Sequence, residues 1–375
     1  MQVKELCRNY IEISKEALNH SYQLFRGLIN KECKLMAVVK SNAYGHDLVQ
    51  YSRHLEMLGA DYLGVDNITE ALALRKNGIK LPILVLGYTL PARIIDVVNS
   101  DSEMTISNME QIGEIENRKF DKKVRVHLKI DTGMHRQGFQ EDEIDVLIEK
   151  LKTCNNIEII GIYTHFADSK NPAFPANTRK QIAIFNLICD KFKLAGYRFI
   201  KHSAASAGAL AYPESHFDMV RVGIGLMGLW PSVEVGAAFE DKVKLIPILT
   251  WKSILSEVKN VKCDERVGYD CTERMNKDSR LAIIPVGYWH GFKRSLSSIG
   301  RVGIHGKLAR VVGRISMDMV VVDVTDIPDA KSGDTVILIS GDQELSAYQM
   351  AKLVDGSWYE IVTNLNPQIL REYIK

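Results

Sequence analysis

The residue with the clearest chemical potential is Lys40, which directly follows Leu35–Val39, an apolar run of the kind that forms a buried strand. A small-polar turn comes next, and a helical pattern follows from His46 to Leu58. A lysine at the carboxyl end of a buried parallel strand faces the mouth in which α/β proteins carry out chemistry. Partial desolvation there favours the neutral amine, which can form a Schiff base. The alternative is an ordinary exposed lysine at a strand end.

A second group of residues could hold an anion. Gly223-Ile224-Gly225 follows the eighth apolar run of the chain, Ser203–Ser206 follows the seventh, and Arg221 lies within the eighth. Small side chains let backbone N–H groups approach a phosphate, and the Ser206 hydroxyl can add a donor. Glycines after a strand are by themselves more often simple turns. A lysine, a phosphate cradle and an arginine around one mouth together indicate pyridoxal phosphate.

The elements that must position these residues alternate regularly between strand and helix patterns. Eight parallel strands joined by helical crossovers close into a barrel, which makes the first and eighth strands neighbours and brings Lys40 close to Arg221. The alternative, an open doubly wound sheet, usually has fewer strands and a Gly-rich first turn, which Lys40–Ala43 is not. The predicted strands are Leu35–Val39, Tyr62–Val65, Pro82–Leu86, Glu103–Ile106, Val124–Ile130, Ile157–Thr164, Phe199–His202 and Met219–Ile224. The predicted helices are Ser14–Ile29, Ile68–Asn77, Pro91–Val98, Asn108–Asn117, Glu141–Cys154, Ala176–Ala195 and Ser206–Ala211, with a short strand before them at Tyr10–Ile13.

The pattern changes near Trp230-Pro231-Ser232, and from Leu245 onward it consists of short β segments with turns. We therefore predict an α/β protein of two domains: a TIM-type (β/α)8 barrel over residues 1–238 and a mostly β C-terminal domain over residues 239–375. The predicted elements of the second domain are strands at Ile248–Leu255, Leu281–Pro285, Arg301–Ile304, Ala309–Val312, Val320–Val324 and Thr335–Ile339, a helix at Ser346–Leu353 and a last strand at Tyr359–Thr363.

Composition limits the function classes. The chain has 375 residues, 48 basic and 46 acidic side chains and 46% hydrophobic residues, which is typical of globular proteins and argues against a nucleic-acid or membrane-surface role. The six cysteines form no CxxC pair, which indicates reduced thiols. No apolar run reaches about 18 residues, the length that a membrane-spanning helix needs. Residues 1–10 lack the apolar region of a signal peptide. We therefore expect a soluble cytoplasmic protein.

Six stretches in order along the chain resemble the alanine racemase family, the barrel-type pyridoxal phosphate enzymes. The resemblance covers essentially the whole sequence. It implies the family's two-domain architecture and a head-to-tail homodimer in which the partner's β domain completes each active site. The matching stretches are AVVKSNAYGH (37–46), LKIDTGMHRQG (128–138), GIYTHFA (161–167), FDMVRVGIGLMG (217–228), VGYWHG (286–291) and VGRISMDMVVVDV (312–324).

The resemblance assigns two bases. It implies that Lys40 holds the cofactor as a Schiff base and then acts as one acid/base, while Tyr269 of the other subunit is the base on the opposite face. Racemisation requires removal and return of the α-proton on opposite faces, and a single base would favour retention. A tyrosine (ordinary pKa about 10) needs nearby positive charge or hydrogen bonds to act near neutral pH, and His165 and Arg136 are implied to supply them.

The remaining roles are also implied by the resemblance. Arg221 would hydrogen-bond the pyridine nitrogen; because arginine keeps its proton, that nitrogen would stay unprotonated, which suppresses transamination and decarboxylation. Lys129 matches a lysine that is carbamylated in some members and orients Arg136. The implied phosphate contacts are Tyr44, Ser206, Gly223 and Ile224; the implied substrate carboxylate contacts are Arg136 and the backbone of Met317; Asp318 and Tyr288 match the wall and entrance; and no metal is implied.

The chain departs from the family pattern at several positions. Ala205 replaces Asn, His135 replaces the commoner Asn, and His290 replaces the usual Asp. Asn366-Pro367 is interpreted as standing where a tyrosine lies near the small-substrate pocket, so that loss of the phenol would enlarge that pocket. Several of these changes resemble the serine racemase branch of vancomycin-resistance systems, which usually carries a membrane domain. They leave the substrate open between alanine, serine and longer amino acids.

Three function hypotheses follow. The first is an alanine racemase, making a D-amino acid of the kind used in cell wall biosynthesis, with a serine or broader-specificity racemase as its variant. The second is a barrel-type amino-acid decarboxylase, which usually holds the ring nitrogen by a carboxylate rather than by a residue such as Arg221. The third is a non-catalytic pyridoxal-phosphate-binding protein, typically a lone barrel, against which the β domain with Tyr269 and Met317-Asp318 argues.

Overall fold

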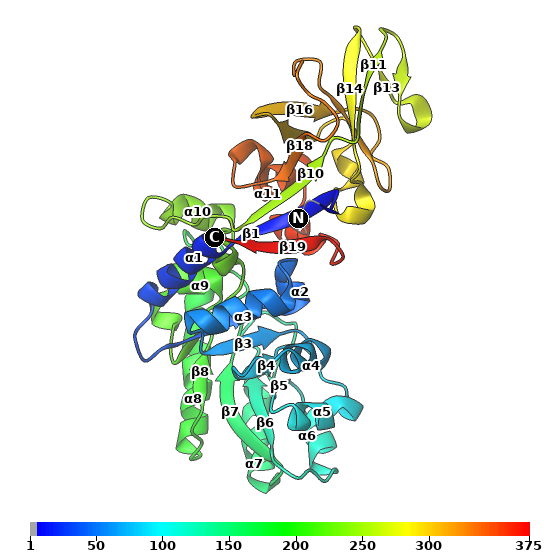
Figure 1. Ribbon diagram of the computed structural model, residues 1–375. Coiled ribbons are helices and arrows are strands. Elements are labelled where there is room, and N and C mark those ends of the chain that lie inside the picture. Colours follow the sequence, from blue (N-terminus) through cyan, green and yellow to red (C-terminus); the bar gives the residue numbers. More distant parts are fainter. Residues whose placement is uncertain (1–5) are drawn as a thin grey trace. The chain divides into compact units, whose positions relative to one another are not determined.

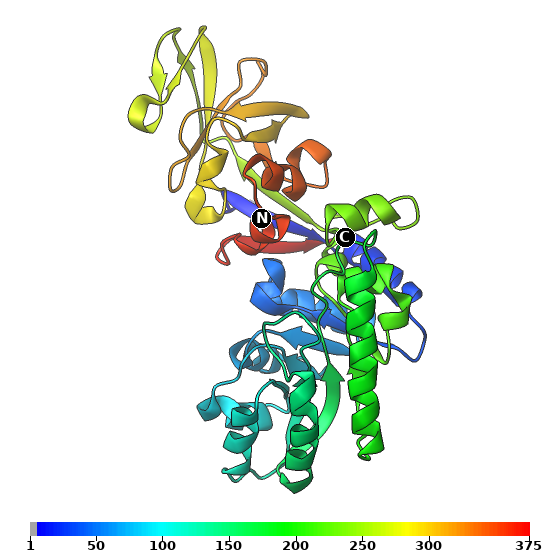
Figure 2. The same ribbon diagram turned by 180° about the vertical axis from the view of Figure 1, so that it is seen from behind.

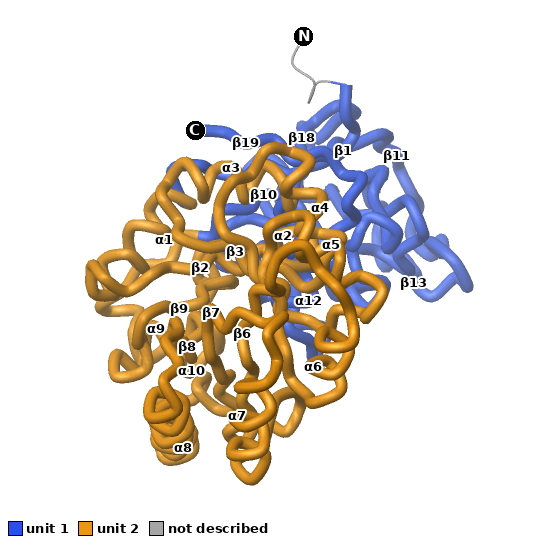
Figure 3. The backbone as a smooth tube through the Cα atoms, turned by 90° about the horizontal axis from the view of Figure 1, so that it is seen from below, with its two compact units in different colours: residues 1–17, 44–47, 247–375 blue, residues 18–43, 48–246 orange. Residues whose placement is uncertain are grey.

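The computed structural model describes residues 6–375, which form two compact units (Figure 3). We call residues 18–43 and 48–246 the barrel unit, and the residues up to 17 together with 44–47 and 247–375 the sheet unit. The predicted domain boundary between residues 238 and 239 stays a prediction. The absence of a signal peptide was predicted in part from residues 1–5, which lie outside the described residues.

The barrel unit contains a closed barrel of eight parallel strands in sequence order, which confirms the predicted fold. Its strands are buried almost continuously, as expected where helices cover the outside of a parallel sheet. Figures 1 and 2 show these helices around the strands. The strands are β2 (Lys34–Val38), β3 (Tyr62–Val65), β4 (Ile83–Val85), β5 (Glu103–Ile106), β6 (Val124–Lys129), β7 (Ile157–Tyr163), β8 (Ile200–His202) and β9 (Met219–Val222).

The predicted crossover helices are confirmed, and side chains fix several of their ends. The Asn67 side chain accepts a hydrogen bond from the Glu70 amide (3.1 Å) at the start of α4, and Asn108 accepts one from the Gln111 amide (3.0 Å) at the start of α6. The helices are α1 (Lys15–Leu28), α3 (Leu48–Leu58), α4 (Ile68–Lys76), α5 (Ile94–Asn99), α6 (Met109–Glu116), α7 (Ile144–Thr153), α8 (Ala176–Leu194), α9 (Ser206–Ala211) and α10 (Val233–Phe239), with single 3-10 turns η2 (Pro91–Arg93), η3 (Glu141–Glu143), η4 (Pro213–Ser215) and η5 (Ile224–Met227).

The turn after Lys40, α2 (Lys40–Tyr44), has an unusual backbone. Four successive non-glycine residues, Ser41 to Tyr44, have φ values between 50° and 56°, so this turn is left-handed. Such a conformation costs about 1–2 kcal/mol per residue and persists only where the surroundings enforce it. Glu70 of α4 contributes, because its Oε1 accepts hydrogen bonds from the amides of Ser41 (2.7 Å) and Asn42 (3.3 Å). The chain therefore leaves Lys40 along a strained but anchored path.

The sheet unit is built on a nine-stranded sheet with the order β11-β14-β17-β16-β15-β18-β10-β1-β19. The predicted strand at Tyr10–Ile13 is β1, which pairs antiparallel with β10 and parallel with β19. The strands are β1 (Asn9–Ser14), β10 (Leu249–Ile254), β11 (Glu257–Val261), β14 (Ser279–Ile284), β15 (Arg301–Ile304), β16 (Lys307–Val311), β17 (Val320–Asp323), β18 (Thr335–Ile339) and β19 (Leu370–Ile374), with a small hairpin of β12 (Arg266–Val267) and β13 (Glu273–Arg274). Its helices are α11 (Ala347–Leu353) and α12 (Trp358–Thr363), with the 3-10 turns η6 (Tyr269–Cys271), η7 (Tyr288–His290), η8 (Arg294–Leu296) and η9 (Gln343–Leu345).

One predicted element of this unit is wrong. Tyr359–Thr363 is not a strand but most of α12, and the last strand is β19. A short apolar run is ambiguous between strand and helix, and here the Ser357 side chain decides it by accepting a hydrogen bond from the Tyr359 amide at the helix start (3.3 Å). The strand β11 was not predicted.

None of the helices within residues 6–375 is both long and apolar enough to cross a membrane. All six cysteines are free thiols. Among the described residues, no group of three His, Cys, Asp or Glu side chains is arranged to hold a metal ion.

Candidate active site

Lys40 and Arg221 lie on neighbouring strands because the barrel closes between its first and last strands. Strand β2 pairs with β9, with Met36 opposite Arg221, and Lys40 follows the end of β2. The predicted proximity of these two strands is confirmed. A potential Schiff-base lysine and a buried arginine thus share one edge of the barrel.

Arg221 is buried (3% exposed), and both of its terminal guanidinium nitrogens make hydrogen bonds. Its guanidinium donates to the carbonyl oxygens of Thr164 (2.8 Å) and Ser203 (2.9 Å) and lies 3.0 Å from Nδ1 of His202 and 3.3 Å from Nδ1 of His165. Burial lowers the pKa of Arg221 to about 10. The side chain therefore stays a cation near neutral pH and is fixed in one orientation.

Basic side chains gather around Arg221. Burial, followed by the charges of Arg221 and Arg136, holds the pKa of Lys129 well below its usual range. Burial is also the largest cause of the low pKa of His165, to which Lys129, Arg221, Arg136 and Lys40 add in decreasing order. The barrel thus brings these five predicted site residues into one region, in which the charges of Arg221 and Arg136 suit an anionic ligand.

The residues predicted to form a phosphate cradle meet after the ends of β8 and β9. The Ser206 hydroxyl, at the start of α9, accepts hydrogen bonds from the amides of Gly223 (3.2 Å) and Gly225 (3.3 Å). Ile224 begins η5 between them and is buried. A hydroxyl and neighbouring amides therefore converge on one place, as a phosphate requires.

Arg136 lies in the loop after β6 and is exposed. It lines a cavity of about 490 Å³ together with Tyr88, Ser107, Asn108, Gln137 and Gly138. The loop is shaped by Asp131, whose Oδ1 accepts hydrogen bonds from the amides of Gly133, Met134 and His135 (2.9–3.1 Å). A small carboxylate could reach the guanidinium from this cavity.

Tyr44 belongs to the sheet unit, where its ring lies 6.4 Å from the ring of Tyr359. Burial raises the pKa of Tyr44 to about 12, so it is a neutral hydrogen-bond donor. The next residue, Gly45, packs so closely that a Cβ there would lie 2.0 Å from the Val362 carbonyl oxygen. Nε of Arg371 donates a hydrogen bond to the Gly45 carbonyl oxygen (3.0 Å). Tyr359, beside Tyr44, was not among the predicted site residues.

The interpretation of Asn366-Pro367 as the place of a lost phenol stays a prediction; the aromatic ring beside Tyr44 is that of Tyr359. The Asn366 amide group donates to the carbonyl oxygen of Trp289 (3.1 Å), and its backbone N–H donates to the carbonyl of His290 (3.2 Å). Asn366 therefore anchors η7.

The other predicted residues of the sheet unit lie in neighbouring turns. The backbone N–H of Tyr288 donates a hydrogen bond to the Ser316 carbonyl oxygen (3.1 Å). The backbone N–H of Trp289 donates one to the Met317 carbonyl oxygen (3.0 Å). Asp318 lies 3.9 Å from Nδ1 of His290. Tyr269 begins η6 and is exposed (67%).

The donor set of the barrel fits pyridoxal phosphate. The phosphate would be held by the Ser206 hydroxyl and the amides of Gly223 and Ile224, the ring nitrogen would face Arg221, and the aldehyde carbon would bond to the Lys40 amine. A closed barrel with these groups, together with a β-rich unit, is the architecture of a barrel-type amino-acid racemase.

Comparisons with known proteins support that class. Residues 13–231 match the pattern of the alanine racemase N-terminal domain and residues 248–373 that of the C-terminal domain. The chain is 35% identical to alanine racemase 1 of Oceanobacillus iheyensis (100% of both chains covered) and 39% identical to alanine racemase of Symbiobacterium thermophilum (92% of both). An alanine racemase structure from Clostridium difficile 630 superposes with a TM-score of 0.93 at 33% identity, covering 98% of this chain and 96% of that one.

The chain therefore belongs to the alanine racemase family. It is an isomerase of the amino-acid racemase class, and pyridoxal phosphate is the cofactor of that family.

Proposed function

We propose that this protein interconverts L- and D-alanine by a two-base mechanism. The observation that carries the proposal is the buried Arg221, held by hydrogen bonds on the strand next to the one that Lys40 follows. A guanidinium donor retains its proton, so the ring nitrogen stays unprotonated, which favours proton exchange at the α-carbon over decarboxylation. Alanine is the substrate that the names of the relatives support.

The two bases are Lys40 and Tyr269 of the partner subunit. When bound, pyridoxal phosphate supplies an electron sink that makes the α-proton removable. The amine of Lys40 exchanges that proton on one face, and the phenol oxygen exchanges it on the other. The phenol needs positive charge or hydrogen bonds to act near neutral pH; Arg136 would provide the charge and His165 a hydrogen bond.

The other roles follow from the same arrangement. Arg136 and the Met317 backbone bind the substrate carboxylate, while Asp318 and Tyr288 form the wall and entrance of the site. The cofactor is held by Lys40, Tyr44, His165, Ser206, Arg221, Gly223 and Ile224.

Lys129 is proposed to carry a carbamate that orients Arg136. A neutral amine is the form that attacks carbon dioxide: the nitrogen bonds to carbon and loses a proton, leaving an anion. The low pKa of Lys129 supplies the neutral amine, and nearby Arg136 and Arg221 would stabilise the anion. Incubation with ¹³C-bicarbonate should give a carbamate NMR signal that is absent from Lys129→Met. The same spectrum from both proteins would reject the modification.

A homodimer is proposed because the sheet unit exposes a set of large apolar side chains around adjoining turns. Tyr288, Trp289, Met317 and Met319 are each 42–56% exposed. Hybrids of Lys40→Ala and Tyr269→Phe test whether sites are shared between subunits. Each hybrid dimer would contain one intact site, so random assortment should restore about a quarter of wild-type activity. No recovery in verified hybrids would place both bases in one subunit.

Racemisation assays with L-alanine, L-serine, L-lysine and L-arginine test the reaction and its substrate. We expect L-alanine to react fastest, with cofactor absorbance near ~420 nm from the Schiff base. Serine is the second candidate because Ala205, which precedes α9 without a side-chain cap, stands where the family usually has the larger Asn. Faster turnover of serine would move the assignment to that branch, and carbon dioxide release without D-product would indicate a decarboxylase.

A cytoplasmic location, with the D-alanine product available for cell wall biosynthesis, completes the proposal. The support for the location is the set of six free cysteines, since oxidising compartments convert such thiols to disulfides.

A further inference from the structure

Four polar side chains form a continuous line of hydrogen bonds through the barrel interior. Oε2 of Glu103 on β5 lies 2.7 Å from Nε2 of His127 on β6; Nδ1 of His127 lies 2.8 Å from Nε2 of His202 on β8; and Nδ1 of His202 lies 3.0 Å from Nη1 of Arg221 on β9. All four side chains are 0–3% exposed. We call these four residues the interior relay.

The positions of the hydrogens in the interior relay follow from its two ends. Arg221 can only donate, so Nδ1 of His202 must accept and its proton must lie on Nε2. That proton is donated to Nδ1 of His127, whose own proton therefore lies on Nε2 and is donated to the Glu103 carboxylate. Every buried donor has an acceptor only if both imidazoles are neutral and both carry their proton on Nε2.

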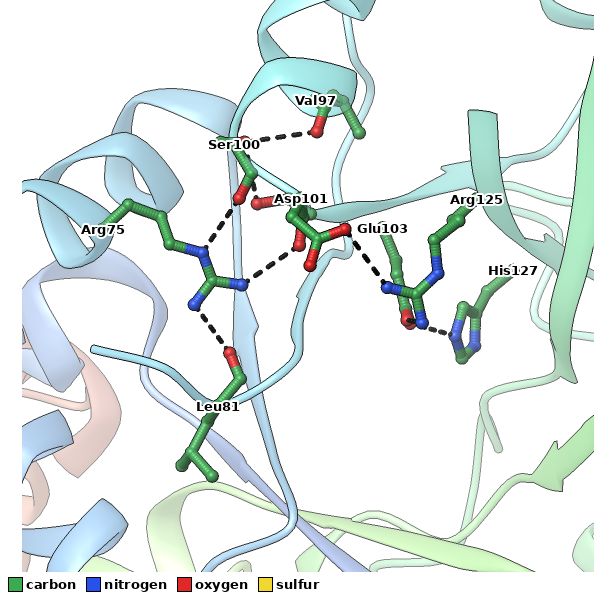
Figure 4. A network of polar contacts seen from close by, with 9 residues as sticks. Arg75, Leu81, Val97, Ser100, Asp101, Glu103, Arg125 and His127 are labelled. Carbon is green, nitrogen blue, oxygen red and sulfur yellow. Dashed lines mark hydrogen bonds and ion pairs between the residues drawn. The ribbon is translucent and has the colours of Figure 1, made fainter. Parts of the chain in front are cut away.

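The carboxylate end is anchored at the edge of the barrel. Oε1 of Glu103 lies 2.6 Å from a guanidinium nitrogen of Arg125, which is about one-third exposed and also lies 3.6 Å from Asp101 (Figure 4). Burial, and then the Glu103 charge, raise the pKa of Tyr62 to about 12, so this neighbour stays neutral. The Glu103 carboxylate is thus a fixed, hydrogen-bonded anion.

The two imidazole rings are also fixed sterically. The Tyr163 ring stacks on His202 (4.8 Å between centres, 7° between planes), and its hydroxyl is held by Thr105 Oγ1 (2.9 Å). His127 packs against Gly161, where a Cβ would lie 2.2 Å from Nδ1. The rings therefore have little freedom to turn, and their protonation is decided by the partners at the two ends.

We propose that Glu103 and His127 are positioning residues of the racemase, which act on Arg221 through His202. The carboxylate sets the tautomers of both imidazoles, so that Arg221 meets an acceptor and its guanidinium is held as a charged donor toward the cofactor's ring nitrogen. The side chains that face Arg221 from other strands and loops include Lys129, Arg136 and His165, which are cationic or neutral. Glu103 is the buried anion to which Arg221 is connected by hydrogen bonds.

This inference rests on the proposed function for its role in catalysis, but its hydrogen arrangement can be tested without activity. ¹⁵N NMR of apo-protein labelled at histidine reports which ring nitrogen carries the proton. We expect His127 and His202 each to carry a single ring proton, on Nε2. In His127→Phe, the Nε2–H of His202 loses its acceptor while Arg221 still requires Nδ1 to accept, so the Nε2 signal of His202 should move to the position of an N–H without that hydrogen bond. A wild-type His202 in the Nδ1–H form, or a His202 Nε2 signal unchanged by His127→Phe, would overturn the relay.

The functional part is tested with Glu103→Gln, which keeps the size and the acceptor oxygen but removes the charge. Carboxylates that orient a histidine behind a reactive centre are commonly worth about 10–100-fold. We expect kcat to fall about tenfold with little change in KM, and the pH midpoint of the cofactor absorbance to shift downward, because Arg221 loses its counter-charge. Glu114→Gln, which removes a carboxylate from an exposed ion pair with Arg118 (3.0 Å), is the matched control and should change neither.

A Glu103→Gln enzyme with wild-type kcat and wild-type absorbance titration would overturn the positioning role. Failure of the wild-type protein to racemise any amino acid would instead reject the proposed function, and the NMR result would still decide the relay.

Discussion

The Nζ atom of Lys129 lies 4.4 Å from the centre of the Tyr163 ring. The lysine is buried (6% exposed), and the nearest charges that act on it strongly are those of Arg221 and Arg136. A cation over an aromatic face is stabilised by about 0.5–2 kcal/mol, which is less than the cost of burying it beside two other cations. Unless it is modified, the amine is therefore neutral in the folded protein.

This predicts a pH-dependent stability. At pH values between the lowered pKa of Lys129 in the folded protein and the ordinary pKa of 10.5, Lys129 binds a proton only in the unfolded chain. The free energy of unfolding should then rise with pH by about 1.4 kcal/mol per pH unit from this residue alone. Lys129→Met should remove that slope in denaturant titrations run in carbon-dioxide-free buffer. An unchanged slope would show that Lys129 is charged when folded.

The buried histidines give a second pH prediction. Burial is the main cause that holds the pKa values of His165 and His202 well below 6.5, so folding requires both rings to be neutral. Their stability contribution is complete above pH 6.5 and is lost as the pH falls, because the unfolded chain then binds protons that the folded protein does not. Denaturant midpoints should therefore drop between pH 6.5 and 5. His165→Gln should lessen the drop, whereas His135→Gln, at an exposed position, should not.

Gly161→Ala should destabilise the barrel, because the new Cβ would lie 2.2 Å from His127 Nδ1. Overpacking of this kind costs about 1–3 kcal/mol. Gly113→Ala is the matched control: it lies inside α6 with no atom within 4 Å of the added Cβ, and should stabilise the helix by about 0.5–1 kcal/mol. Thermal unfolding midpoints should move in opposite directions, and a stabilised Gly161→Ala protein would contradict the packing.

Tyr269→Phe should lower racemisation by about 10²–10⁴-fold while the cofactor absorbance persists, because the substitution removes only the phenol oxygen. Tyr269 is exposed in the described chain, so its loss should leave the unfolding midpoint unchanged. Stereospecific exchange of the α-proton with solvent deuterium would remain on the Lys40 face. Full racemase activity would exclude Tyr269 as a base.

The barrel could be predicted from the sequence because buried parallel strands leave nearly continuous apolar runs. Closure then implied that β2 and β9 are neighbours, and with them Lys40 and Arg221. The cradle at Ser206 and Gly223 could be predicted for a similar reason, since small residues follow two successive strands. These features depend on local composition and on strand order, both of which can be read from the amino-acid sequence.

The interior relay could not be predicted in this way. Glu103 and His127 stand inside apolar runs, and their meeting with His202 depends on how β5, β6 and β8 are aligned with one another. The left-handed turn from Ser41 to Tyr44 could not be predicted either. It contains no glycine, the usual sequence signal of this conformation, and it is stabilised by Glu70 from another helix. Contacts between distant segments decided both.

The pairing of β1 with β10 and β19 has a consequence for how the chain is assembled during synthesis. The eight barrel strands are contiguous in sequence, so they can close as soon as β9 has left the ribosome, since domains generally fold as units while translation continues. β1 emerges before all of them, yet its two neighbours come much later, and β19 is the last strand to be made. A nascent chain must therefore keep an unpaired strand edge from aggregating until translation is nearly complete.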